Sequence, residues 1–303
     1  AIATINNGYG PCNTEKDIIT RCMFYNMPTL RSISLPSGIT KIGEYALAQD
    51  RNINYMLTHV DILSGVTQID HYAFWYTGIE EVTVPVGVTR LEEYTFWNCR
   101  KLKRATLPDG ITFIGNSCFS ECHELEDVNM PASLETIDQY AFYDNYKRTT
   151  PIVFPTGLKS IGGHAFTDNR LVKSIPFNDG LEAIRSYAFY NCYALESITL
   201  PESITTLEDH IFVNCDSLTE FTFPASITVV PYAIFDYCDK LQKVTLAPGT
   251  TKIDSYAFED CPRLNTINIT EQTALTSISN SAFLNTGFTT MTLPNQISEM
   301  GSQ

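Results

Sequence analysis

Apolar and polar positions recur along this chain with a period of about 23 residues. Each repeat carries an aromatic or aliphatic anchor, most often the phenylalanine of a Tyr-Ala-Phe string, and seven of the eleven steps between anchors are 23 residues long. The other four steps are 22, 24, 25 and 27 residues. A fixed period of this length predicts stacked structural repeats that share one continuous core. The anchors are Phe24, Leu47, Phe74, Phe96, Phe119, Phe142, Phe166, Phe189, Phe212, Phe235, Phe258 and Phe283.

One repeat, residues 189–212, shows the predicted elements most clearly. Ile198 and Leu200 alternate with polar neighbours, and this period of two predicts a short strand with one buried face. Pro201 ends the strand because proline has no N–H for the ladder. A second short extended piece begins at Ile204. A turn residue that suits an N-cap follows, and the Tyr-Ala-Phe string is then expected to open a single helical turn.

The repeating unit "LP-x-x-I-T-x-I-x-x-x-A-F-x-x-C-x-x-L-x-x-I" resembles the BspA-type leucine-rich repeat, which occurs on bacterial surfaces and in some parasitic protists. The resemblance runs from about residue 18 to the end. It implies an α/β fold: a right-handed leucine-rich repeat solenoid of about twelve 23-residue coils with parallel β-strands and short helical turns. The residues that occupy family slots in the clearest copy are Ala188, Phe189, Cys192, Leu195, Leu200, Pro201, Ile204 and Leu207.

Departures from the repeat are few, and they define the expected domain boundaries. Leu47 replaces the anchor phenylalanine, and Arg148 stands where leucine is expected. Residues 1–17 lack the pattern and are predicted to cap the first coil, so the solenoid is expected to occupy residues 18–303. The last repeat stops in mid-unit without the polar cap that an open solenoid end needs. We therefore expect this chain to be truncated at its C-terminus, as part of a longer protein, or to end against another chain.

Charge and composition exclude several classes of partner. The chain has 20 Lys and Arg against 34 Asp and Glu, a formal net charge of −14. This balance disfavours binding to nucleic acid, which needs clustered cations, and docking on anionic lipid. No apolar run approaches the ~18–20 residues of a membrane span, so we expect no membrane insertion.

The cysteines follow the repeat. Six of nine stand three residues after an anchor, and a spacing of about 23 residues fits no zinc signature, which needs close pairs of ligands. We predict a column of buried free thiols and no metal site. Whether Cys12 and Cys22 form a disulfide in the N-terminal segment is left open. The six are Cys99, Cys122, Cys192, Cys215, Cys238 and Cys261.

No catalytic constellation emerges from the sequence. No nucleophile stands beside a base, and there is no glycine-rich phosphate loop. His164 and His210 occupy the tyrosine position before the anchor two repeats apart, roughly 10 Å, which is too far for shared metal ligation. We therefore predict a protein that is not an enzyme and binds no cofactor.

Two sets of residues are the candidate binding groups. Aromatic residues directly after the anchor are expected to be exposed, and exposed Trp and Tyr often mark interaction surfaces, although packing between coils is the alternative. Small polar residues at the outward positions of the strands form the second set. The first set is Trp75, Trp97, Tyr143 and Tyr190, and the second is Thr106, Asn129, Thr199 and Thr222.

These features favour a non-catalytic module that binds an extracellular or cell-surface protein. The resemblance implies the same, since better-known family members are adhesins that bind host matrix proteins or mediate contact between cells. We accordingly expect a location at the cell surface or secretion. The alternative is a carbohydrate- or cell-wall-binding module that uses Trp and Tyr to bind a glycan.

Overall fold

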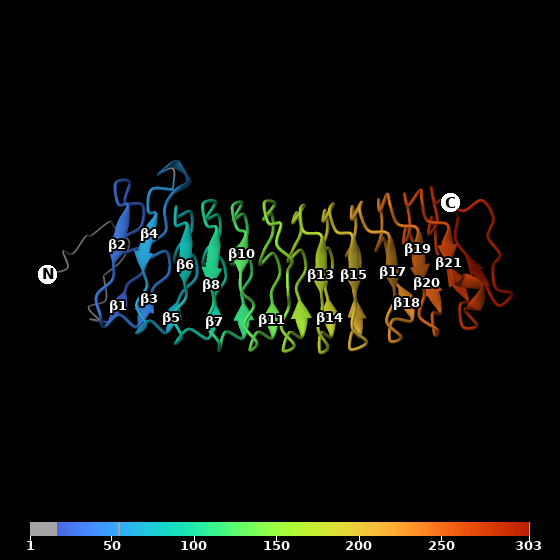
Figure 1. Cartoon of the computed structure of the whole chain (residues 1–303), viewed down its shortest axis with the longest axis horizontal. Coiled ribbons are helices and arrows are strands. Elements are labelled where there is room, and N and C mark those ends of the chain that lie inside the picture. The colour runs from blue at the N-terminus through green and yellow to red at the C-terminus, as the bar shows by residue number, and fades with distance from the viewer. Residues whose placement is uncertain (1–16, 54, 303) are drawn as a thin grey trace. The chain divides into compact units, whose positions relative to one another are not determined.

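The computed structural model describes residues 17–53 and 55–302, which divide into two compact units. Unit 1 ends at Lys147 and unit 2 begins at Arg148. Each unit contains six of the twelve anchors. Figure 1 shows that within each unit short strands recur side by side, one coil after the next. Both units are therefore parallel β-solenoids.

Unit 1 contains two rows of parallel strands, because each coil contributes two short extended pieces. The first row carries strands of two or three residues, and the second row follows the turn after each first-row strand. The first row is β2 (Ser32–Ser34), β4 (His59–Asp61), β6 (Glu81–Thr83), β8 (Arg104–Thr106) and β10 (Asp127–Val128). The second row is β1 (Ile18–Ile19), β3 (Lys41–Ile42), β5 (Gln68–Ile69), β7 (Arg90–Leu91), β9 (Phe113–Ile114) and β11 (Thr136–Ile137).

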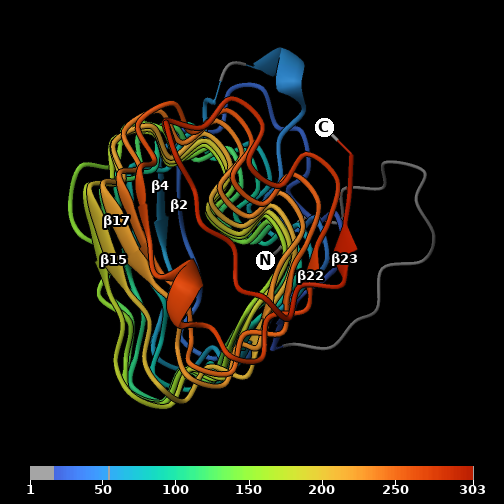
Figure 2. The same cartoon turned by 90° about the vertical axis from the view of Figure 1, so that its right-hand side faces the viewer.

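Unit 2 repeats the arrangement. Figure 2 shows β15 (Ser197–Thr199) and β17 (Glu220–Thr222) on one side of its coils, and β22 (Ser277–Ile278) and β23 (Glu299–Met300) on the other. The other first-row strands are β13 (Ser174–Pro176), β19 (Lys243–Thr245) and β21 (Thr266–Ile267). The other second-row strands are β12 (Ser160–Ile161), β14 (Ala183–Ile184), β16 (Thr206–Leu207), β18 (Val229–Val230) and β20 (Lys252–Ile253).

Stacked phenylalanine rings run through the core of each unit. In unit 1, Phe74, Phe96 and Phe119 are fully buried, and neighbouring ring centroids lie 5.1 and 5.2 Å apart. In unit 2, Phe212 lies 5.9 Å from Phe189 and 5.6 Å from the next anchor. The constant period places each ring on the equivalent ring of the next coil, so every coil buries its apolar face against its neighbours.

The predicted helical turns are wrong. In the part of the chain that the structure describes, the helical elements are two 3₁₀ turns, η1 (Arg51–Ile53) and η2 (Ile269–Glu271), and neither contains a Tyr-Ala-Phe string. The anchor segments are chains of tight turns instead. The α/β class that we inferred is therefore corrected to a solenoid of strands and turns with almost no helix.

Left-handed backbone at two positions per repeat explains this difference. Around Phe74, both Tyr72 and Tyr76 have a φ of 58°. The acceptors of successive N–H groups then alternate between a carbonyl in the same turn and a carbonyl in the next coil. The N–H of Phe74 donates to the carbonyl of Thr95 at 2.9 Å, whereas that of Trp75 donates to Tyr72 at 3.0 Å. Every N–H is satisfied without the i→i−4 bonds of a helix, so the segment stays flat against its neighbour.

Candidate functional site

The outward positions of the first-row strands are exposed, as the alternating pattern predicted. Thr106 in unit 1 and both Thr199 and Thr222 in unit 2 have exposed side chains between buried neighbours. Asn129 is also exposed, but its amide accepts from the N–H of Leu107 at 2.7 Å and donates to that residue's carbonyl at 2.8 Å. The threonines are therefore free surface groups, whereas Asn129 holds two coils together.

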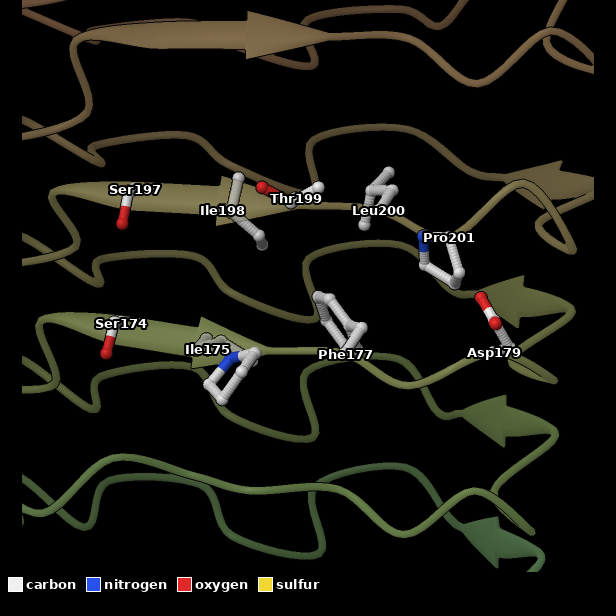
Figure 3. A pocket seen from close by; sticks show the side chains of 10 residues that line it. Ser174, Ile175, Phe177, Asp179, Ser197, Ile198, Thr199, Leu200 and Pro201 are labelled. Carbon is white, nitrogen blue, oxygen red and sulfur yellow. The ribbon is translucent and has the colours of Figure 1, made fainter.

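A hollow of about 500 Å³ opens on the first row of unit 2, between β13 and β15. Figure 3 shows its three zones. The hydroxyls of Ser174 and Ser197 lie at one end, Phe177 and Thr199 lie in the middle, and the Asp179 carboxylate lies beside the proline turn at the other end. Thr199 is the predicted site residue that lines this hollow.

An apolar patch adjoins the hollow. Outward positions on the first row are mostly hydroxyl-bearing, but Pro176 takes this position in β13 and Val153 takes it one coil earlier, where its side chain is 60% exposed. The rings of Phe154 and Phe177, the residues directly after these two, stack at 5.3 Å, which fixes the register of the coils. We call Val153, Pro176 and Phe177 the apolar patch.

The predicted aromatic residues are half-buried and pack on one another. Trp75 and Trp97 stack in unit 1 with ring centroids 5.7 Å apart and an interplanar angle of 16°. Tyr143 packs edge-on against Tyr140 at 5.8 Å. In unit 2, Tyr190 packs in the same way against Tyr187, also at 5.8 Å. Packing between coils, the alternative considered from the sequence, accounts for the tryptophan pair, whereas Tyr143 and Tyr190 each pack on the tyrosine three residues earlier in their own coil.

A tyrosine column that sequence reasoning did not single out lies beside the tryptophans. The ring of Tyr72 is stacked on Tyr45 and on Tyr94, each at 4.6 Å. Burial, together with these two tyrosines and Glu93, raises the pKa of Tyr72 to about 12. The recurrence of tyrosine two residues before the anchor was the signal for this column, but stacking depends on the left-handed backbone that orients the rings.

His164 and His210 lie on either side of Tyr187 in unit 2, at 4.6 and 4.4 Å between ring centroids. Burial lowers the pKa of both imidazoles, so they are neutral at neutral pH. They are stacking partners of the same tyrosine, which the sequence analysis did not predict. Within residues 17–53 and 55–302, no group of three or more His, Cys, Asp or Glu side chains is placed to hold a metal ion.

The six repeat cysteines are buried, and the structure describes all of them as free thiols. Each donates to the anchor carbonyl of the preceding coil: the Sγ of Cys238, for example, lies 3.1 Å from the oxygen of Phe212. Burial raises the pKa of the Cys238 thiol far above its ordinary value, so it is a hydrogen-bond donor and not a nucleophile. Cys12 lies outside the described residues, and its pairing with Cys22 is untested.

Comparison with known proteins identifies the repeat. The BspA type leucine-rich repeat region matches in six copies, over residues 17–149, 144–264 and 182–303. This chain belongs to the BspA type leucine-rich repeat family. The expected family is thereby confirmed, over residues 17–303. A comparison with curated proteins finds no match.

Solved structures of bacterial leucine-rich repeat proteins share the fold of this family member. One from Eubacterium ventriosum is 22% identical, with a TM-score of 0.60, over 89% of this chain and 80% of that one. A leucine-rich cell surface protein from Faecalibacterium prausnitzii is 24% identical, with a TM-score of 0.52, over 95% and 76%. Among the described residues, no helix is long and apolar enough to cross a membrane.

Proposed function

We propose that this leucine-rich repeat protein is a non-catalytic module that binds another protein through the first strand row of unit 2. The observation that carries the proposal is that this row exposes Val153, Pro176, Thr199 and Thr222 on successive coils, beside a hollow of about 500 Å³. Exposed apolar groups rimmed by polar ones are typical of protein interaction sites. The Faecalibacterium protein is called a cell surface protein, which supports a surface or secreted location.

Catalysis has no support in the geometry. The described thiols other than Cys22 are buried, and the described histidines at 164 and 210 are half-buried stacking partners. Carbohydrate binding stays a prediction with less support. A sugar would need to stack on an open ring face of Trp75 or Trp97. One face of each of these rings is covered by the other ring.

A binding screen tests the proposal. The purified chain is applied to an array of extracellular matrix proteins and glycans, beside three variants. We expect a protein to be bound and its binding to be lost when Thr199 and Thr222 are both changed to Arg. The matched control is Thr228→Arg, because Thr228 is an exposed threonine next to the second row of the same unit. Binding to glycans alone, lost on changing Trp75 and Trp97 to Ala, would contradict the proposal.

A further inference from the structure

The hollow on unit 2 has a distribution of chemistry that selects one kind of occupant. Its two serine hydroxyls lie at one end, its apolar surface lies in the middle, and Asp179 lies at the other end (Figure 3). Ser174 begins β13, and Asp179 lies in the turn that follows the end of β13 at Pro176, so the hollow runs along the strand and into its turn. A hollow of this form fits a short extended peptide segment better than a globular face.

The apolar middle provides the anchor site. Pro176, which is exposed, and Phe177, which is half-buried, line the hollow. Val153 is 60% exposed and stands at the equivalent outward position one coil before Pro176. Such a site gains free energy by covering an aliphatic or proline side chain of a partner, since apolar area removed from water stabilises at about 25 cal/mol per Å². The floor below is closed by buried Ile175 and Ile198.

The polar ends provide direction. Within the part of the chain that the structure describes, the hydroxyls of Ser174 and Ser197 make no bond to the protein, and the Asp179 carboxylate has no ion-pair partner. The hydroxyls can therefore bond to the backbone of an incoming segment. Asp179 favours a cation, and the net charge of −14 on the chain also favours a basic partner.

We infer that this hollow binds an extended segment of a partner protein in which an aliphatic or proline residue is followed by Lys or Arg. The inference rests on the proposed function and names the partner chemistry for the same surface. The apolar side chain lies on the apolar patch, and the cation pairs with Asp179. Pro176 has no N–H, so the segment is held by side chains and by the serine hydroxyls, and not by extension of the β-ladder.

A peptide array tests this assignment with the intact chain. The probes are short linear peptides with Val, Ile or Pro followed by Lys or Arg, together with counterparts in which Glu replaces the cation or Ser replaces the apolar residue. We expect the apolar–basic peptides to bind, and Val153→Asp and Pro176→Asp to weaken that binding by about tenfold or more. Asp179→Asn should remove the preference for Lys or Arg over Glu while leaving the apolar preference.

The control is Val229→Asp, which adds the same charge at another exposed valine of unit 2, 42% exposed in β18. It should leave peptide binding unchanged, and thermal unfolding should show that all variants fold. Equal binding of all peptide classes, or binding that survives both Val153→Asp and Pro176→Asp, overturns the inference. If a protein on the matrix array binds and its binding is unaffected by Val153→Asp, Pro176→Asp and Asp179→Asn, the inference is wrong and the proposed function stands. If no protein on the array binds, the proposed function is wrong.

Discussion

At the scale of single residues, the cysteine at the third position after the anchor links two coils. Its thiol donates to the previous anchor carbonyl, for example from Cys238 to Phe212 at 3.1 Å. Where threonine takes this position, as at Thr77, the hydroxyl donates to the anchor carbonyl of its own coil, Phe74, at 2.8 Å. Cysteine and threonine therefore both place a small hydrogen-bond donor at this position, and cysteine does so with the less polar side chain.

Substitutions at Cys238 test this role. Cys238→Thr should be more stable than Cys238→Val by about 1 kcal/mol, because the two side chains have nearly the same shape and only threonine keeps a donor. Urea unfolding of both variants beside the parent chain measures the difference. Equal midpoints for the two variants would show that the position selects for size alone.

Asp236 is a half-buried carboxylate whose pKa is strongly raised. Its burial, together with the charges of Glu259 and Asp260, raises its pKa to about 7. The folded chain then keeps a proton that the unfolded chain has lost above about pH 4, so Asp236 lowers stability as pH rises from about 4 to about 7.

Asp236→Asn should therefore stabilise the protein at pH 8, by an amount on the order of 1 kcal/mol after allowance for solvent screening. The gain should shrink as pH falls towards 4. Thermal unfolding of parent and variant across this range measures it. A gain that is constant with pH would mean that the carboxylate does not titrate in this window.

At the scale of elements, the strands were predictable and the turns were not. The two-residue alternation around Ile198 located β15 correctly, because one face of the strand is buried against neighbouring coils. The prediction of a helical turn was wrong because alanine and phenylalanine suit a helix locally. The residues with positive φ that prevent the helix are of many types, so the sequence does not reveal them. A tyrosine with positive φ is costly alone, by roughly 1–2 kcal/mol, and ring stacking between coils offsets that cost.

The left-handed position two residues after the anchor allows a direct test. Asn214 has a φ of 58°, and its amide donates to the side chain of Asn191 at 2.7 Å. Asn214→Val should destabilise unit 2 by about 1–3 kcal/mol, since a β-branched residue is strained at positive φ and the side-chain bond is lost. Asn214→Gly should cost less because glycine adopts this backbone freely. Urea midpoints rank the two, and the reverse order would contradict the turn geometry.

The candidate site was predictable only in part. The exposure of Thr199 and Thr222 followed from strand alternation. The tryptophan positions were identified but their role was not, because stacking between coils depends on backbone geometry that the spacing does not reveal. The hollow is lined by the coils of β13 and β15, with Pro176 and Phe177 on one side and Thr199 on the other. Proline at position 176 is visible in the sequence, but the volume of the hollow is a property of the packing.

At the scale of the whole molecule, the repeat makes stability a sum of contacts between neighbouring coils. In unit 2 the ring of Phe212 contacts Phe189 and Phe235, and no anchor further along the unit. Damage to one coil should therefore spread no further than its neighbours. A globular core of the same size would instead distribute the loss over the entire unit, because its residues share contacts across many elements.

Phe212→Ala distinguishes these cases. Loss of a fully buried ring costs about 3–5 kcal/mol. Native-state hydrogen exchange should then show reduced protection in the coils anchored by Phe189, Phe212 and Phe235, while the coil of Phe283 keeps its protection. The alternation of N–H groups between local turns and the next coil reinforces this expectation, since each coil donates only to its immediate neighbour. Uniform loss of protection across unit 2 would show instead that the unit unfolds as one cooperative block, so that a change in the apolar patch would also alter coils far from the hollow.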